Sequence, residues 1–306
     1  MNADLVRRYN AHYGIPDASA ASEEMILHHW ALERRLASEL QASDAEHRWE
    51  VFERCYTTLY SELRWLNELG GIESTEAPVA VARDWAALVG PPPKRVYEVG
   101  SGKGRLIAAL ADLGYDCTAT EITRERGAKW TKSHGALRWR VSDGVHLDRF
   151  ETSRSYDAVI SDQVIEHLHP DDLPAHFRGA HTILREGGRY VFATPHTFEG
   201  PFDVSRVFGS DRAEGMHLKE YTYRELWQAL RSAGFKRIHA ALRMPRGMRA
   251  RFGGRPLPIR SRGYLHYLSA VESVIERLPR RRRPRAARAL RALMWTSAIF
   301  LIATKK

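Results

Sequence analysis

Hydrophobic positions in the first quarter of the chain follow the three-and-four spacing of amphipathic helices. The first such stretch begins after Ser22 and two acids, a combination typical of a helix N-terminus. The second begins at Ser43 and ends at Gly70-Gly71, so that the pattern predicts a helical hairpin, whereas residues 1–20 show no clear period. We interpret the aromatic stripe of the second helix as packing against the rest of the protein, with a lid over an active site as the alternative. The positions that set the spacing are Met25, Leu32, Leu36, Leu40, Trp49, Phe52, Tyr56, Leu59, Leu63 and Leu66.

The pattern changes after a further helix predicted at 77–89, which ends before three consecutive prolines. From there on, short apolar runs alternate with helical stretches, and this alternation predicts a parallel sheet with helices on both faces. We therefore expect an α/β fold with a doubly wound, mostly parallel, seven-stranded sheet and an N-terminal helical hairpin. The expected organisation is a helical lid or packing region at 1–76 and a main domain at 77–306. The predicted strands are 95–99, 116–122, 137–141, 156–161, 189–194, 236–242 and 297–304.

Composition excludes several classes of protein. The chain has 306 residues, of which 43 % are hydrophobic and 27 % are charged, as in ordinary globular proteins. Two cysteines, Cys55 and Cys117, are too few for a disulfide framework. The longest apolar run, 298–303, is far shorter than the roughly 20 residues that cross a bilayer. We expect a cytoplasmic protein with no transmembrane segment.

The net charge of +10 comes from one segment. Residues 243–291 contain fifteen arginines, no lysine and two acids, whereas the rest of the chain has a net charge of −3. We place this basic insertion before the last strand, at one edge of the sheet, with a helix at 264–275 that covers the acceptor site. Three interpretations stay open: a solvated edge, a clamp for an anionic substrate, or a surface for nucleic acid or anionic lipid.

Glycines at alternate positions follow the first predicted strand, in the order Glu98-Val-Gly100-Ser-Gly102-Lys-Gly104. Glycines at such a turn let a ligand approach the backbone at the start of a helix. The dinucleotide pattern G-x-G-x-x-G would need its third glycine at Arg105, so a nicotinamide enzyme is disfavoured. The segment instead resembles the first motif of class I S-adenosylmethionine-dependent methyltransferases, with Lys103 and Arg105 expected to face solvent.

Further stretches resemble later motifs of that family at the expected distances. Glu121 ends the second predicted strand, Asp143 follows the third, and Asp162 ends the fourth, before Glu166-His167. The resemblance implies a Rossmann-like methyltransferase domain that binds S-adenosylmethionine. In that interpretation Gly100, Gly102 and Gly104 shape the methionine pocket, with Glu98 near the amino-acid end. Glu121 would hold the ribose, Asp143 would meet the adenine, and Asp162 would belong to the same cofactor site.

Histidines and one acid supply the candidate chemistry for methyl transfer. His167, His217 and Glu166 are the predicted catalytic residues, with His169 and His196 as further candidate bases. Glu166-His167 resembles the end of the Glu-x-x-Glu-His run that helps bind a divalent ion in the O-methyltransferases of ubiquinone biosynthesis and in terminal 2′-O-methyltransferases of small RNAs. Here Gln163 replaces the first acid, and a neutral amide is a weaker ligand for a hard cation. We therefore assign no metal ligands and favour a site without a metal, with a divalent metal as the alternative. Aromatic residues are expected to line the acceptor pocket: Phe198, Phe202, Phe208, Tyr221 and Tyr223.

The sequence thus predicts an S-adenosylmethionine-dependent methyltransferase that O-methylates a hydroxyl of a small molecule, such as a sugar or another biosynthetic intermediate, with a histidine base. The acceptor could be anionic. The alternatives are an RNA 2′-O-methyltransferase, which the basic segment favours, and a non-catalytic cofactor-binding module of the same fold. Neither the methylated atom nor the oligomeric state follows from these residues.

Overall fold

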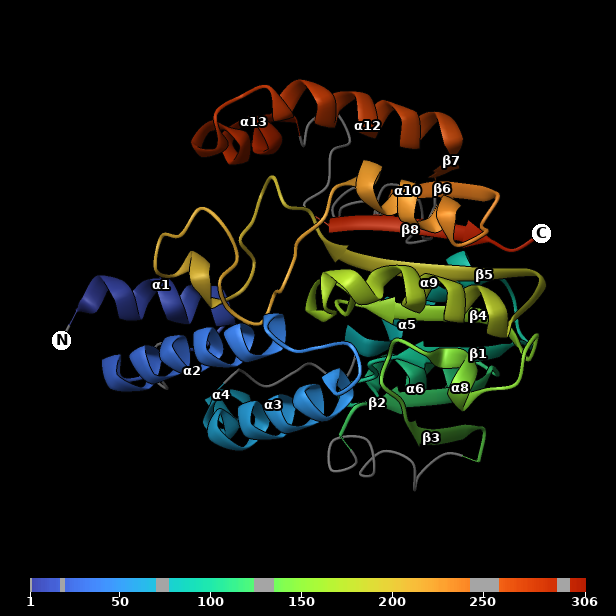
Figure 1. Cartoon of the computed structure of the whole chain (residues 1–306), viewed down its shortest axis with the longest axis horizontal. Coiled ribbons are helices and arrows are strands. Elements are labelled where there is room, and N and C mark those ends of the chain that lie inside the picture. The colour runs from blue at the N-terminus through green and yellow to red at the C-terminus, as the bar shows by residue number, and fades with distance from the viewer. Residues whose placement is uncertain (1, 17–19, 70–76, 124–134, 243–258, 291–297) are drawn as a thin grey trace.

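The computed structural model describes residues 2–16, 20–69, 77–123, 135–242, 259–290 and 298–306. A central sheet with strand order β3-β2-β1-β4-β5-β8-β6-β7 organises the protein (Figure 1). β1 to β5 run parallel, whereas β8 is antiparallel to both of its neighbours, β5 and β6. This arrangement confirms the α/β, mostly parallel, doubly wound fold. The strands are β1 (Arg95–Val99), β2 (Asp116–Glu121), β3 (Leu137–Val141), β4 (Tyr156–Asp162), β5 (Leu184–Pro195), β6 (Arg237–Leu242), β7 (Ile259–Ser261) and β8 (Ala298–Thr304).

The seven predicted strands are all present, and the short β7 adds an eighth at the edge beside β6. β7 lies within the arginine-rich stretch, where three residues are too short to show an alternating pattern. β5 begins five residues before the predicted start. The residues Arg185 to Gly188 resemble a turn in sequence, and the pairing of β4 with β5 shifts register at this end.

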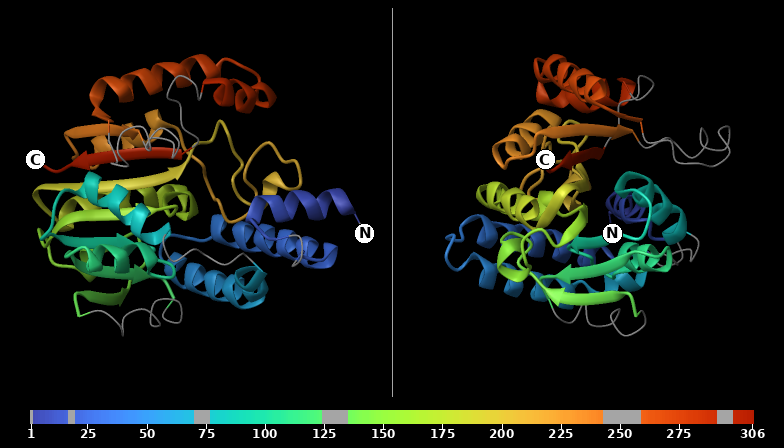
Figure 2. Two further views of the ribbon diagram at one scale, coloured as in Figure 1. Left: turned by 180° about the vertical axis from the view of Figure 1, so that it is seen from behind. Right: turned by 90° about the vertical axis from the view of Figure 1, so that its right-hand side faces the viewer.

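Helices cover both faces of the sheet, and each face has its own apolar core (Figures 1 and 2). α5 (Ala77–Val89) and α6 (Arg105–Asp112) pack on one face around Trp85, Leu110 and Ile160. α9 (Leu173–Ile183), α10 (Tyr223–Ser232) and α12 (Arg262–Glu276) pack on the other. The remaining short helical elements are α8 (Leu147–Phe150), α13 (Arg283–Ala289), η2 (Ile165–His167), η3 (Pro170–Asp172), η4 (Val204–Arg206) and η5 (Arg280–Arg282).

The N-terminal helices lie beyond the carboxyl ends of the parallel strands (Figure 1). The predicted hairpin corresponds to α2 (Glu23–Gln41) and α3 (Arg48–Glu62), followed by α4 (Arg64–Leu69). α3 begins five residues later than predicted, because the Ser43 hydroxyl binds the Leu40 carbonyl and is not an N-cap. The structure adds α1 (Ala3–Tyr13), whose buried face of Leu5 and Tyr9 is too short to give a clear period. In the part of the chain that the structure describes, no helix is long and apolar enough to cross a membrane.

A buried carboxylate joins α12 to the start of α10. Glu272 accepts hydrogen bonds from His196 Nε2 at 2.8 Å, from the Tyr223 amide at 2.5 Å and from the Arg224 amide at 3.1 Å. The side chains of Glu272 and His196 are both fully buried. His196, which the sequence suggested as a candidate base, therefore has a structural role. The Glu272 carboxylate accepts hydrogen bonds from two amides in the first turn of α10, which have no acceptor within the helix.

We expect Glu272→Ala to lower the free energy of unfolding by about 3–5 kcal/mol, because it leaves His196 and two amides buried without their acceptor. Urea denaturation followed by circular dichroism measures the change. Glu276→Ala is the matched control on the same helix, because that carboxylate is half exposed and pairs with Arg224 at the surface. Its removal should cost about 1 kcal/mol or less. Equal losses in the two variants would contradict this role of Glu272.

Candidate active site

The glycine turn after β1 forms the floor of the site. Gly100, Gly102 and Gly104 have φ angles of 63°, 56° and 70°, in the left-handed region that favours glycine. A Cβ at Gly100 would lie 2.8 Å from Val164 Cγ2, so a larger residue there would collide with the segment after β4. Gly104 is the N-cap residue of α6. The predicted role of these glycines in shaping a backbone turn thus agrees with their conformation.

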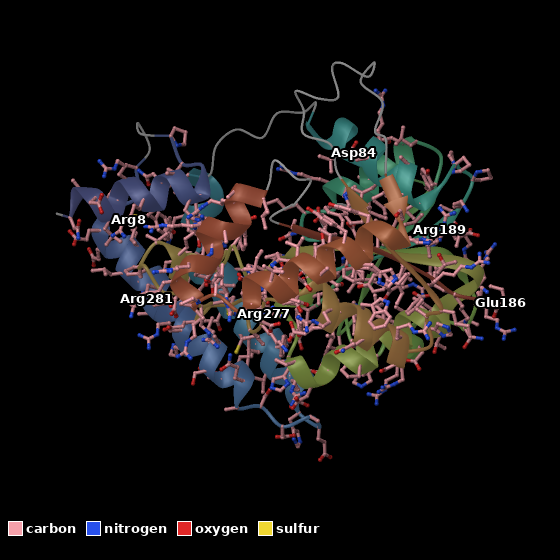
Figure 3. All side chains as sticks on the ribbon, turned by 90° about the horizontal axis from the view of Figure 1, so that it is seen from above. Arg8, Asp84, Glu186, Arg189, Arg277 and Arg281 are labelled. Carbon is pink, nitrogen blue, oxygen red and sulfur yellow. The ribbon has the colours of Figure 1, made fainter. Side chains whose placement is uncertain are left out.

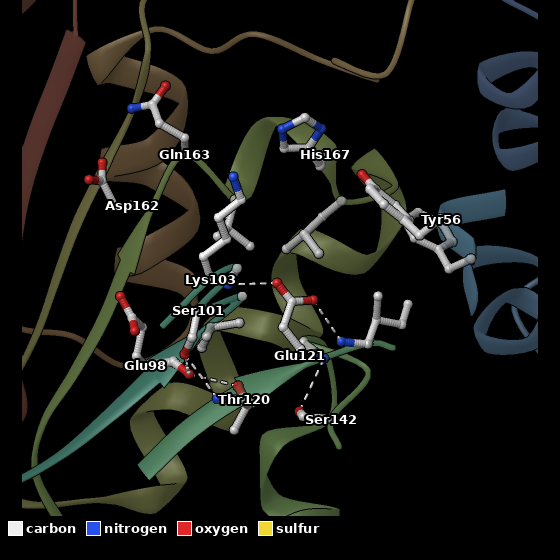
Figure 4. Close-up of a pocket in the computed structure, with 18 of the residues that line it drawn as sticks. Tyr56, Glu98, Ser101, Lys103, Thr120, Glu121, Ser142, Asp162, Gln163 and His167 are labelled. Carbon is white, nitrogen blue, oxygen red and sulfur yellow. Dashed lines mark hydrogen bonds between the residues drawn. The ribbon is translucent and has the colours of Figure 1, made fainter. Parts of the chain in front are cut away.

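A cavity of about 560 Å³ opens above this turn, at the carboxyl ends of β1, β2 and β4 (Figure 4). Such an opening arises where the strand order reverses direction. Residues from α2 and α3 complete its wall. The α3 residues in that wall are Phe52, Tyr56, Leu59 and Tyr60.

The charges that line the cavity are mostly negative. It has five carboxyl groups, from Glu33, Glu98, Glu121, Asp143 and Asp162. Lys103 and Arg105, which were expected to face solvent, are the lysine and arginine of the lining, and both are partly buried. An excess of carboxyl groups in a partly enclosed cavity favours a cationic ligand.

Glu98 is the acid best placed for such a ligand. Its side chain is buried in the cavity wall, and one carboxyl oxygen, Oε2, has no hydrogen-bond partner among the residues that the structure describes. Burial, and to a lesser extent the nearby charges of Asp162 and Glu121, raise the pKa of Glu98 to about 8, although a hydrogen bond with the Ser101 side chain acts in the opposite direction. A bound ammonium group would supply the missing partner and stabilise the carboxylate.

Glu121 and Asp143 also line the cavity, as predicted for ribose and adenine contacts, but both accept hydrogen bonds from the protein. Glu121 Oε1 accepts from the Gly102 amide at 2.7 Å, and Oε2 accepts from the Ile122 amide at 3.1 Å. Asp143 accepts from the amides of Val145 and His146 and from the His146 ring. Both carboxylates are thus fixed in orientation by backbone amides at the edge of the cavity.

His167 is the predicted catalytic residue that lines the cavity. Its Nδ1 lies 2.8 Å from the Met216 carbonyl oxygen, which can only accept a hydrogen bond. The neutral ring is therefore protonated on Nδ1, and Nε2 is its basic nitrogen. The ring of Tyr56 meets the ring of His167 edge to face, with 6.3 Å between centroids.

Glu166 and His217, the other predicted catalytic residues, lie beside His167 but do not line the cavity. Glu166 is fully buried and accepts from the Thr194 hydroxyl at 2.9 Å. Burial raises the pKa of Glu166 to about 7. Burial lowers the pKa of His217, but its hydrogen bond to Glu220 and the charge of Glu166 outweigh burial and raise that pKa to about 9. The ionisable groups of Glu166 and His217 therefore lie next to the His167 ring but outside the cavity wall.

Among the described residues, Glu166, His167 and His217 can offer one metal-ligand atom each, and these atoms lie within 4.8 Å of one another. The set is a poor fit for a hard cation, which prefers six or more oxygen ligands. Gln163 is exposed and does not belong to the set. We therefore derive no step through a metal.

Other predicted site residues have structural roles. His169 accepts from the Asp171 amide and caps η3. None of the aromatic residues expected to line the acceptor pocket lies in the cavity wall. Tyr223 is a core residue and Phe208 stacks on Trp30 of α2. The aromatic residues of the cavity wall come instead from α3. Their spacing of three and four positions along this helix was the signal in the sequence that could have indicated them.

Of the basic insertion predicted at 243–291, the structure describes residues 259–290, and none of these lines the cavity. α12 packs on α10 and β6 and contributes no residue to the cavity, so the expectation that this helix covers the acceptor site is wrong. α12, η5 and α13 form a strip that bears Arg277 and Arg281 (Figure 3). Arg280 and Arg283 line a second cavity of about 320 Å³, together with Arg212 and Lys219. The two cavities share no lining residue.

In Rossmann-like sheets, ligands bind at the carboxyl ends of the strands where the strand order reverses, and this cavity lies at that point. Its excess of carboxyl groups favours a ligand with positive charge. A sequence profile described as a methyltransferase domain matches residues 75–240, more than half of the chain. The chain therefore belongs to the methyltransferase-domain family. The predicted class, the S-adenosylmethionine-dependent methyltransferases, and its cofactor are confirmed.

Individual relatives are more distant. Ubiquinone biosynthesis O-methyltransferase from Xanthomonas campestris pv. campestris is 31 % identical over 150 residues, which are 47 % of this chain and 61 % of that protein. The match thus spans less than two thirds of the relative. Two solved structures share the fold. 1,6-Didemethyltoxoflavin-N1-methyltransferase from Burkholderia thailandensis has a TM-score of 0.53, with 17 % identity over 86 % of this chain and 91 % of its own. An S-adenosylmethionine-dependent methyltransferase from Archaeoglobus fulgidus has a TM-score of 0.51, with 15 % identity over 82 % and 99 %.

The environment of Glu98 predicts that cofactor binding releases a proton. With a pKa of about 8, the free carboxyl group is mostly protonated at pH 7, and a bound cation lowers that pKa. Binding of S-adenosylmethionine should therefore release a fraction of a proton at pH 7 and almost none well above pH 8. Calorimetry at pH 7 in buffers of different ionisation enthalpy measures this release.

Glu98→Gln should abolish the proton release, whereas Glu24→Gln, a change at an exposed residue of α2, should leave it intact. Equal proton release from the wild type and Glu98→Gln would show that another group titrates.

Proposed function

We propose that this protein transfers the methyl group of S-adenosylmethionine to a hydroxyl oxygen of a small molecule. The observation that carries the proposal is His167, a histidine of fixed tautomer in the cavity wall with Nε2 as its basic nitrogen. The Xanthomonas relative, named as an O-methyltransferase, supports the choice of oxygen.

When bound, the cofactor supplies an electrophilic methyl group on a positively charged sulfur. We propose that Gly100, Gly102 and Gly104 accommodate its methionine part, that Glu98 binds its ammonium group and that Glu121 accepts its ribose hydroxyls. Asp143 would receive the adenine, and Asp162 would add negative charge near the sulfonium. Each assignment is supported by the position of the residue in the cavity wall.

His167 would then remove the hydroxyl proton of the acceptor. As the oxygen–carbon bond forms and the sulfur–carbon bond breaks, the proton passes from the hydroxyl to Nε2 of His167. Glu166 and His217 would act on the acceptor only through His167, because neither lines the cavity. Their charges bear on how readily His167 takes the proton.

We also propose roles for the flanking regions. Residues 1–76 would form a wall or lid over the cavity of the main domain at 77–306, supported by the α3 residues in the cavity lining. The part of the acceptor that enters the first cavity would not be strongly anionic, because the carboxyl groups of that lining would repel a negative charge. Both cysteines are free and buried, which supports the proposed cytoplasmic location.

We expect His167→Ala to lower kcat by about 100-fold to 10,000-fold, because it removes the proposed general base. The affinity for S-adenosylhomocysteine, measured by calorimetry, should change little, since the cofactor contacts remain. His169→Ala is the control, because His169 lies two residues away and caps η3. An unchanged kcat for His167→Ala would remove this residue from the reaction.

Incubation with methyl-labelled S-adenosylmethionine and a host extract, divided into RNA, lipid and small-molecule fractions, tests the acceptor class. We expect the label in the small-molecule fraction, with equal incorporation with and without magnesium. Label in RNA would support the alternative that the run of exposed arginines at 280–282 favours, an RNA 2′-O-methyltransferase. Label in no fraction, with intact cofactor binding, would support a non-catalytic binding module.

A further inference from the structure

The backbone segment Gly215-Met216, which accepts a hydrogen bond from His167, donates hydrogen bonds to two buried carboxylates. The Gly215 amide donates to Asp203 Oδ2 at 2.8 Å, and the Met216 amide donates to Glu33 Oε2 at 3.1 Å. A Cβ at Gly215 would lie 2.3 Å from the same Glu33 oxygen and 2.9 Å from the Asp203 oxygen. The backbone therefore reaches these acids only because residue 215 is glycine.

Met216 links this contact directly to the proposed base. Its amide donates to Glu33, and its carbonyl accepts from His167 Nδ1 at 2.8 Å. Glu33 belongs to α2, 183 residues away from Met216 in sequence. An N-terminal helix thus fixes the backbone residue that orients the His167 ring.

Glu33 is held in place from its other side by a buried chain of hydrogen bonds. His29 Nε2 lies 2.8 Å from Glu33 Oε1, and the Tyr9 hydroxyl lies 2.6 Å from His29 Nδ1. All three side chains are buried. Burial opposes ionisation of Glu33, but the hydrogen bond and charge of His29, the hydrogen bond from the Met216 amide and the charge of His217 together outweigh burial and lower the pKa of Glu33 below its ordinary value. The carboxylate is therefore charged and accepts at both oxygens.

We propose that Glu33 is a positioning residue for catalysis: through Met216 it holds the His167 ring in the tautomer and orientation that direct Nε2 at the acceptor. The chain from Tyr9 through His29 to Glu33 makes α1 and α2 part of the catalytic apparatus and not merely a cover. The inference rests on the proposed function for its catalytic consequence, whereas the link from Glu33 to His167 can be measured without any reaction.

Nuclear magnetic resonance of protein with ¹⁵N-labelled histidine tests that link. In the wild type, His167 should give the spectrum of the Nδ1-protonated tautomer, assigned by its loss in His167→Gln. Glu33→Ala should shift it toward a mixture of tautomers, because Met216 loses its anchor. Glu33→Gln should retain most of the wild-type signal, since an amide oxygen can still accept from Met216. An unchanged His167 spectrum in Glu33→Ala would overturn the proposal.

Kinetics provides the second measurement. Glu33→Ala should lower kcat by about tenfold to a hundredfold, because small misplacements of a catalytic group have effects of that size. The affinity for S-adenosylhomocysteine should stay within about threefold. Glu33→Gln should recover most of the activity, and Glu24→Ala, at an exposed position of the same helix, should resemble the wild type.

The double variant separates positioning from a general loss of structure. If Glu33 acts through His167, adding Glu33→Ala to His167→Ala should lower kcat little further. Losses that simply multiply would overturn the proposal. If Glu33→Ala does not fold, as judged by circular dichroism, Gly215→Ala displaces the same segment and replaces it in both measurements. A protein that methylates no acceptor would refute the proposed function, and the histidine spectra would still decide whether Glu33 positions His167.

Discussion

The reversal of strand order between β1 and β4 is the constraint on which the rest of the structure depends. The chain leaves β1 toward β2 on one side and leaves β4 toward β5 on the other, so the loops that follow β1 and β4 diverge. The cavity lies between these loops, and its depth requires that nothing fill the turn after β1. Gly100 meets that requirement, because even one added carbon would contact Val164 on the opposite loop. The position of the site is thus a consequence of topology, and glycine keeps it open.

The buried acids of the cavity are explained by a cationic ligand. A carboxyl group without a partner in a low-dielectric setting is unstable as an anion, and Glu98 meets this condition with an unpaired oxygen and a raised pKa. Such a group is retained at a cost in stability when a ligand supplies the counter-charge. A cationic cofactor therefore explains why these acids occupy the carboxyl ends of β1, β2 and β4, where hydrophobic residues would pack at lower cost.

The sheet could be predicted because the signals for its strands are local in the sequence. The contacts that the N-terminal helices make with the site could not be predicted in this way. Strands β1 and β3 and helix α5 have the bounds that the sequence predicts. β1 is a short run buried between β2 and β4, and the edge strand β3 shows instead an alternation of apolar and basic residues. The acids and glycines at the strand ends also lie where the motif spacing puts them. By contrast, Glu33 is one of many acids on an amphipathic helix, and its contact with Met216 closes a loop of 183 residues that no local pattern encodes.

The aromatic residues after β5 were misassigned for the same reason. Their position after a strand end is compatible with a pocket, but packing with α2 and α12 decides where they lie.

The N-terminal helices show how a domain of common fold acquires a particular site. The sheet supplies the cofactor cavity from its own strand ends, but one wall of that cavity belongs to α3 and one of its acids belongs to α2. Tyr9 of α1 and His29 and Glu33 of α2 form a buried chain of hydrogen bonds, so these two helices cannot shift independently without leaving polar groups unpaired, at about 1–3 kcal/mol each. α2 in turn packs on α3 through an apolar cluster that includes Leu36, Leu40, Phe52 and Leu59. These contacts tie the wall to the rest of the N-terminal region, so an acceptor must enter through the open side of the cavity or with a joint movement of the three helices.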